Sequence, residues 1–254
     1  DYRGIDRLSL STAHYWQFVS DDMQFRLHSP GQGDRASAAN DIPWLSQYSI
    51  FPQDDRAGNL MCGPAADAMA LTQLGVVAAS APETVSAARL LAGNRYLGID
   101  RQGGTSPQEL MEGLIRYASE HELEVDFINY AGWRPISGPG TRAHQVSRDW
   151  VAAALDNGAA VLLSIGAYTQ QADGSFARIG AHWVNLRAVD GDGLLVHDPA
   201  PATVKMAGHR VSVLDARLLA QDANRTRFLR GGIGALILDG LPRPEAADTL
   251  ALDA

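Results

Sequence analysis

The chain has 254 residues, of which 46% are hydrophobic and 20% are charged, and its formal net charge is -8. This is enough apolar material to bury one substantial core. The acidic balance and the scattered arginines argue against nucleic acid as a partner, because phosphate contacts need clustered basic side chains. The single cysteine excludes an intrachain disulfide and a cysteine-rich zinc site, and no apolar run is long enough to span a bilayer.

The first forty residues are predicted to be an extension ahead of the main domain. Residues 5–28 mix apolar and polar positions as strands do, with a turn at Asp21-Asp22. Residues 29–40 are rich in Pro, Gly, Ser and Ala, which is typical of an exposed linker. The predicted organisation is an N-terminal extension over 1–40, a main domain over 41–240 and a loose acidic tail over 241–254.

Helices are predicted before most of the strands, which indicates an α+β fold. A helix begins near Cys62, with Pro64 in its first turn and Gly75 as its C-terminal cap. Ser106 and Glu109 form a capping box at the start of another helix. The predicted helices cover 62–74, 83–92, 107–121 and 148–157, and the predicted strands cover 123–130, 159–166, 182–189, 194–197, 203–206, 209–214 and 233–238.

Cys62 is located where an extended segment is predicted to enter a helix. The partial positive charge of a helix N-terminus stabilises a thiolate and lowers the thiol pKa. Gly63 removes side-chain bulk beside the sulfur, so a substrate can come close. A buried structural cysteine is the alternative that position alone leaves open. A thiol nucleophile also needs a base that is distant in sequence and near in space.

His182 and Asp198 are predicted to meet across a hairpin. His182 opens the strand AHWVNLRAV, Asp198 ends the strand LLVHDP, and the glycine-rich turn DGDG joins the two. The end of one strand then lies beside the start of the other, where a carboxylate can hold the histidine tautomer and stabilise the imidazolium. Taken singly, a histidine beside a strand is more often structural, and Asp198-Pro199 can be a simple turn.

Gln47 lies 15 residues before Cys62, in the segment DIPWLSQYS. Its side-chain amide can join the backbone N–H of Cys62 in donating to a developing oxyanion; a surface glutamine in a strand is the alternative. His182, His197 and His209 raise the alternative of a metal site, but their spacing matches no strong metal motif. Neither a metal nor a cofactor is predicted.

Two stretches of the sequence are similar to a known family. The stretch DIPWLSQYSIFPQDDRAGNLMCGPAADAMALTQLG resembles the opening of the bacterial C39-like peptidases, a branch of the papain-like cysteine proteases. The stretches WVAAALDNGAAVLLSIG and AHWVNLRAVDGDGLLVHDPA resemble the second half of those proteins. The resemblance covers roughly 41–206, and it rests on four separated features that occur in the same order.

The resemblance implies a papain-like α+β fold, with an N-terminal helical part that carries the cysteine and a C-terminal antiparallel sheet that carries the histidine and aspartate. It implies Cys62 as nucleophile, His182 as general base and acid, Asp198 as the residue that orients His182, and Gln47 in the oxyanion hole. It also implies a bacterial protein that is exported or secreted. In the branch fused to peptide exporters, the glutamine stands only a few residues before the cysteine. The gap is longer here, so leader-peptide cleavage is not expected.

The predicted function is hydrolysis of an amide bond in a peptide or protein, through a Cys-His-Asp triad and an acyl-enzyme. A side-chain amidase or deamidase, or an acyl transferase, would use the same residues. A non-catalytic binding module on the same fold is the alternative from a different class. The oligomeric state is left open by the sequence.

The segment 131–146 is rich in glycine and proline and predicts a surface loop that does not pair as a regular strand. A position bordering the substrate cleft would let Trp133 provide an apolar contact and Arg134 or Arg142 a charged one. A passive connector is the alternative.

Overall fold

The computed structural model describes residues 19–30, 42–99, 104–132, 136–143, 148–170, 176–190, 193–200, 203–206, 209–213, 226–228 and 236–238. Some predictions fall outside these residues. They are the strands expected over 5–18, the linker over 31–40, Trp133 and Arg134, the turn at Asp173-Gly174 and the tail over 241–254.

The helices are α2 (Asp55–Gly58), α3 (Cys62–Gln73), α4 (Ala81–Ala92), α5 (Pro107–Glu120) and α6 (Arg148–Asp156), with a short 3-10 turn, η2, at Gln47–Ser49. The strands are β1 (Val19–His28), β2 (Glu124–Gly132), β3 (Thr141–Ala143), β4 (Ala160–Gln170), β5 (Phe176–Asp190), β6 (Gly193–His197), β7 (Thr203–Met206), β8 (His209–Val213), β9 (Thr226–Phe228) and β10 (Leu236–Leu238).

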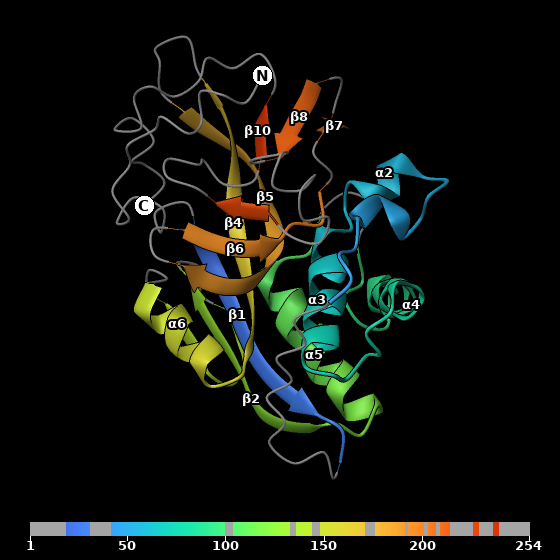
Figure 1. Cartoon of the computed structure of the whole chain (residues 1–254), viewed down its shortest axis with the longest axis vertical. Helices are drawn as coiled ribbons and strands as arrows, with labels where there is room; N and C mark the ends of the chain where they lie inside the picture. Colours follow the sequence, from blue (N-terminus) through green and yellow to red (C-terminus); the bar gives the residue numbers. More distant parts are fainter. Residues whose placement is uncertain are drawn as a thin grey trace.

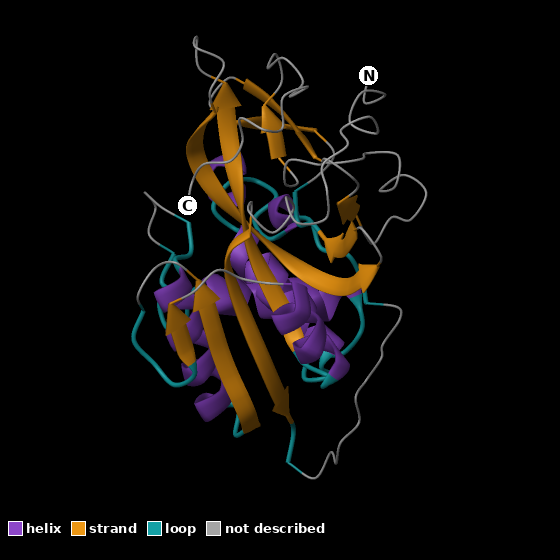
Figure 2. Cartoon of the chain, turned by 90° about the vertical axis from the view of Figure 1, so that its left-hand side faces the viewer, coloured by secondary structure: helices purple, strands orange, loops and turns teal. Residues whose placement is uncertain are grey.

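Within the described residues, ten strands form one sheet and helices lie on both of its faces, which is an α+β architecture (Figure 1). The centre of the sheet is β4, which pairs antiparallel with β1 on one edge and with β5 on the other. β1 pairs in turn with β2, and β5 pairs with β6, both antiparallel. β4 continues past the helices to a region where β10, β8 and β7 extend the sheet (Figure 1). Figure 2 shows the same division from the side, with the helices gathered in one part of the molecule and strands continuing beyond them.

The side chains of β1 alternate between the two faces of the sheet, as the pleat of a strand requires. Met23, Phe25 and Leu27 are fully buried in the hydrophobic core shared with α3 and α5. On the opposite face, the carboxylate of Asp22 accepts a hydrogen bond from the indole of Trp150 in α6 at 3.2 Å. Helices therefore cover both faces of the central strands.

The most enclosed helix is α3, in which every residue from Cys62 to Thr72 is buried. Its sequence, CGPAADAMALTQ, consists largely of small residues. Small side chains let neighbouring elements approach closely, and α3 contacts both α4 and the strands β4 and β5. The helix that begins with Cys62 is thereby fixed between the other helices and the sheet (Figure 1).

The helices predicted from the sequence are confirmed to within one or two residues at each end. The capping box is present: Ser106 Oγ accepts from the Glu109 backbone at 3.3 Å, and the Glu109 carboxylate accepts from the Ser106 backbone at 2.7 Å. The hairpin of β5 and β6 is also present, with Asp190 opposite Gly193. The short elements η2, α2, β3 and β9 are not predicted by the sequence pattern.

The turn predicted at Asp21-Asp22 is wrong, because β1 runs through both residues without interruption. Both carboxylates are buried in the sheet. Asp21 accepts from the Tyr130 hydroxyl at 2.6 Å, and Asp22 accepts from Gln24 at 2.5 Å as well as from α6. β1 also lies ahead of residue 41, the predicted start of the main domain, although it pairs with β2 and β4.

The segment 131–146 is more ordered than a plain loop. β2 extends to Gly132, and β3 pairs with it in parallel, so the prediction that the segment forms no strand is wrong. Arg142, one of the two arginines considered for a charged substrate contact, lies over the ring of Trp150 at 4.5 Å from its centroid. A guanidinium stacked on an aromatic face is held by that ring, so Arg142 has a structural partner on α6.

Candidate active site

Cys62 is the first residue of α3, with Met61 as the N-cap. The first N–H groups of a helix have no partner within it and carry partial positive charge. Only 7% of the Cys62 residue surface is exposed, so a reagent can reach the sulfur by a narrow approach only. The position fits a stabilised thiolate and does not by itself exclude a structural cysteine.

Gly63 allows a close contact with Thr105, in the segment before α5. A Cβ atom added to Gly63 would lie 2.4 Å from the Thr105 hydroxyl oxygen and 2.7 Å from its Cβ. The space that a side chain would occupy is therefore filled by Thr105. The prediction that this glycine opens room for a substrate is corrected: Gly63 is required by packing against Thr105.

His182 lies in β5, opposite Ile165 of β4, and Asp198 follows β6. His182 Nε2 and Asp198 Oδ1 are 2.7 Å apart, and both side chains are almost completely buried. The hydrogen bond predicted between them is therefore present. The same carboxylate oxygen accepts from the backbone N–H of Ala200 at 2.8 Å, which fixes the carboxylate in the turn after β6.

The side chains of His182 and Cys62 are also hydrogen-bonded to each other. Because Nε2 is engaged by Asp198, the ring nitrogen that faces the sulfur is Nδ1. The three residues predicted from separate parts of the sequence thus form one continuous chain of contacts, from sulfur to imidazole to carboxylate. Asn185, the next polar residue along β5, bonds instead to Gln73 at 3.3 Å.

The interactions among Cys62, His182 and Asp198 shift the pKa values of the thiol and the imidazole in opposite directions. Burial alone would lower the pKa of His182, but the charge and hydrogen bond of Asp198, together with Cys62, raise it to about 10. Burial alone would raise the pKa of the Cys62 thiol, but His182 and the backbone N–H groups of Trp183 and Gly63 outweigh it and bring the pKa below its usual value. The arrangement therefore favours a thiolate–imidazolium pair at neutral pH.

Gln47 lies in η2 and connects the two sides of the site. Its backbone N–H donates to the carbonyl of Pro199, next to Asp198, at 2.8 Å. Its side-chain Nε2 donates to the carbonyl of Gly58, on the way to Cys62, at 2.8 Å. The described contacts place this amide against Gly58 and include none between Gln47 and Cys62. A primary amide has two N–H groups, so the contact uses one of them, and the oxyanion role stays a prediction.

Two tryptophans support the site and are not predicted by the sequence pattern. The indole of Trp44 donates to the backbone carbonyl of Asp198 at 2.5 Å. The indole of Trp183 donates to the carbonyl of Thr105 at 2.8 Å, which holds the segment that packs on Gly63. Trp44 shares the segment DIPWLSQYS with Gln47 and Trp183 follows His182, so both are close to predicted residues, but the sequence carries no signal for their partners.

The described residues contain no group of three or more histidine, cysteine, aspartate or glutamate side chains arranged to hold a metal ion. The side chain of His209, part of the metal alternative, lies outside the described side chains. Among the helices of the described part of the chain, none combines the length and the apolar character needed to cross a membrane.

Comparison of the chain with family models, with curated proteins and with solved structures finds no match. The likeness to C39-like peptidases therefore stays a prediction from the sequence, and a function has to be inferred from the geometry of the site.

Proposed function

We propose that this chain is a cysteine hydrolase of papain-like fold that cleaves an amide bond in a peptide or protein. The observation that carries the proposal is the buried contact chain of Cys62, His182 and Asp198, with a 2.7 Å bond between the last two. A base that is held by a carboxylate and faces a thiol at a helix N-terminus is the arrangement that nucleophilic thiol catalysis needs.

The thiolate of Cys62 attacks the carbonyl carbon of the amide, and a C–S bond forms as the carbonyl electrons move to oxygen. The N–H groups at the start of α3 lie beside the attacking atom and are suited to stabilise this oxyanion. His182 then donates its Nδ1 proton to the leaving nitrogen as the C–N bond breaks. The amine leaves, and the acyl group remains on Cys62 as a thioester.

Water completes the reaction. His182, now neutral, takes a proton from a water molecule, whose oxygen attacks the thioester. The C–S bond breaks, the carboxylic acid is released, and the thiolate–imidazolium pair is restored. Asp198 keeps the imidazole in the orientation that directs Nδ1 at the sulfur throughout the cycle.

The test compares the wild type with Cys62→Ala on a peptide library, with new N-termini and released ammonia measured together. New N-termini that depend on Cys62 support peptide cleavage, whereas ammonia without new N-termini identifies a side-chain amidase or deamidase. A thiol-directed acylating probe at neutral pH adds an independent readout: failure to label Cys62 together with no product of either kind would favour the non-catalytic binding module.

A further inference from the structure

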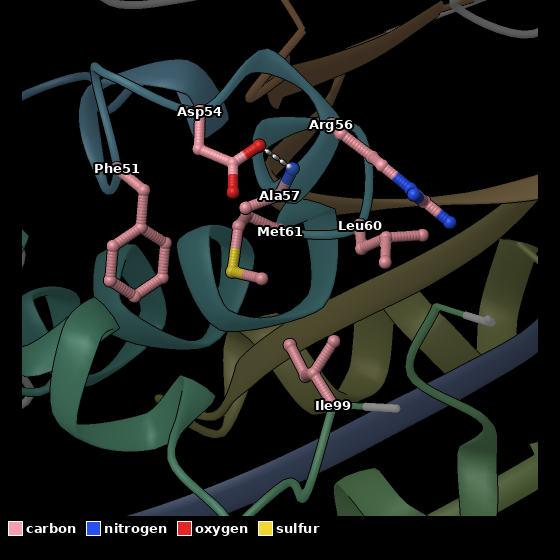
Figure 3. Close-up of a pocket in the computed structure, with 7 residues that line it drawn as sticks. All are labelled: Phe51, Asp54, Arg56, Ala57, Leu60, Met61 and Ile99. Carbon is pink, nitrogen blue, oxygen red and sulfur yellow. Dashed lines mark hydrogen bonds between the residues drawn. The ribbon is translucent and has the colours of Figure 1, made fainter. Parts of the chain in front are cut away.

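The first turn of α3, which carries Cys62, is weakly held on the side of the residues that precede it. Its N-cap is Met61, whose side chain makes no capping hydrogen bond, although such a bond is what usually stabilises a helix start. On the same side lies a pocket of about 510 Å³, and Figure 3 shows the side chains of Leu60 and Met61 at its wall. An open pocket gives its lining residues no protein atoms to pack against. The position of the sulfur is therefore fixed from another side.

Trp183, the residue after His182, reaches this turn through both its backbone and its side chain. Its backbone N–H donates a hydrogen bond to the Cys62 sulfur, and its indole Nε1 donates to the backbone carbonyl of Thr105 at 2.8 Å. The side chain is buried in the hydrophobic core, so the direction of the indole donor is fixed. One residue of β5 thus contacts both the nucleophile and the segment before α5.

Thr105 completes a ring of contacts back to the nucleophile. Its side chain fills the space beside Gly63, where an added Cβ atom would lie 2.4 Å from Thr105 Oγ1. That hydroxyl has no hydrogen-bond partner among the described residues, so Thr105 is tied to β5 by its carbonyl and not by its side chain. The contact ring passes from Cys62 to Gly63 along the chain and to Thr105 by packing. It closes through the indole of Trp183 and the backbone N–H of the same residue, which returns to the sulfur.

The contact ring is anchored in two regular elements. Thr105 precedes Ser106, whose capping box fixes the start of α5, and Trp183 is paired with Ser164 of β4 within the sheet. Donors that are held in place before a reaction need no reorganisation to stabilise a charge. The ring therefore supplies what the start of α3 lacks, which is a rigid support for the sulfur.

Resting on the proposed function, we infer that the indole of Trp183 is a positioning group for the nucleophile: the contact ring holds the sulfur of Cys62 against the backbone of β5, where the Trp183 N–H stabilises the thiolate. The indole acts through Thr105 and through the backbone of its own residue. The catalytic pair then has two separate supports. Asp198 orients the imidazole of His182, and the contact ring orients the sulfur.

Trp183→Phe removes the indole donor and keeps most of the aromatic side chain. Alkylation of Cys62 by iodoacetamide should then be roughly tenfold slower near pH 6, with its inflection moved to higher pH, because the thiolate loses part of its stabilisation. Trp150→Phe is the matched control, since its indole bonds Asp22 on the opposite face of the sheet, and it should keep the wild-type inflection. An inflection that stays in place or falls in folded Trp183→Phe would overturn the proposal.

A second set of variants tests the contact ring without replacing a core tryptophan. In Gly63→Ala the added methyl group collides with Thr105 and displaces the carbonyl that the indole binds, so the alkylation inflection should rise as in Trp183→Phe. Thr105→Gly removes the colliding atoms, and the double variant that combines it with Gly63→Ala should return the inflection toward the wild-type value. No rise in Gly63→Ala, or a rise that the double variant does not reverse, contradicts the contact ring.

Peptide cleavage separates this inference from the proposed function. In Trp183→Phe, kcat/KM should fall roughly tenfold near pH 6 and much less at a pH where both proteins carry the thiolate. A fall of the same size at every pH, with an unshifted alkylation inflection, would assign Trp183 to general stability and overturn the positioning role. Inflections that move as expected, without any Cys62-dependent product from the peptide library, would refute the hydrolase and leave the contact ring standing.

Discussion

Trp44 donates its indole N–H to the backbone carbonyl of Asp198 at a distance of 2.5 Å. His182 holds the carboxylate of the same residue at 2.7 Å, so Asp198 is fixed through both its backbone and its side chain. If the chain is the proposed hydrolase, Trp44 is a positioning residue, because it affects His182 only through Asp198.

Replacing Trp44 with Phe keeps most of the ring and removes the donor. Loss of one neutral hydrogen bond costs about 0.5–1.5 kcal/mol, which corresponds to a roughly two- to tenfold fall in kcat with KM nearly unchanged. Trp150→Phe is the matched control, because that indole bonds Asp22 under α6. Equal effects of both variants on kcat would show that Trp44 contributes only to general stability.

The pH dependence of thiol alkylation tests the pairing of Cys62 with His182. Since the pKa of Cys62 lies below its usual value, the thiolate is present at pH values where an ordinary thiol is mostly protonated. Iodoacetamide should label Cys62 near pH 6 much faster than it labels a free cysteine in a short peptide. In His182→Ala the inflection should move above that of the peptide, because burial then dominates. The chain has a single cysteine, so all label reports this residue.

Asp198→Asn should slow turnover by at least about a hundredfold and leave the fold intact, because an amide neither stabilises the imidazolium nor fixes its tautomer. The pKa of His182, about 10 in the wild type, should fall, since burial lowers it and the carboxylate no longer opposes burial. The imidazolium is then lost at lower pH, and the alkaline limb of kcat/KM should move down. The control is Asn185→Ser, on the same strand as His182, which should leave the alkaline limb of kcat/KM in place.

Gln47→Ala tests the predicted oxyanion role. Loss of one oxyanion donor typically costs about 2.7–4 kcal/mol in the transition state, so kcat should fall roughly a hundredfold or more while KM changes little. A two- or threefold fall, accompanied by lower stability to urea, would assign Gln47 to holding Gly58 and Pro199 together and would remove it from the oxyanion hole.

Asp67, in the middle of α3, is fully buried, and both carboxylate oxygens lack a hydrogen-bond partner among the described residues. Burial raises its pKa well above the usual value. Above about pH 4 the unfolded chain ionises Asp67 while the folded chain keeps it protonated, so this residue lowers stability as pH rises. The free energy of unfolding of Asp67→Asn, minus that of the wild type, should therefore increase with pH by up to about 1.4 kcal/mol per pH unit. Urea unfolding between pH 4.5 and 8 measures this difference. A pH-independent difference would contradict the assignment.

Local signals in the sequence predict much of what positions the site. The capping box at Ser106 depends on residues three positions apart, and the meeting of His182 with Asp198 results from a tight hairpin. Both rest on rules that operate within a few residues. No local rule predicts the contact of Cys62 with this hairpin. It is expected only from the resemblance to the C39-like peptidases, in which the same features follow one another in the same order.

Contacts between distant residues account for the predictions that fail. Asp21 and Asp22 predict a turn because buried adjacent aspartates are rare, but Tyr130 and Trp150 supply their partners from more than a hundred residues away. From the sequence, Gly63 suggests access for a substrate. In the structure, a side chain at this position would collide with Thr105. Sequence spacing contains no information about either contact.

The placement of β1 between β2 and β4 has a consequence for how the chain is made. Its register partners begin with Glu124 of β2 and Ala160 of β4, so β1 leaves the ribosome about a hundred residues before its first partner strand is made. At about 5–20 residues per second, this is a delay of several seconds or more. During that time a strand with Met23, Phe25 and Leu27 on one side remains uncovered, which makes the nascent chain a candidate for chaperone binding.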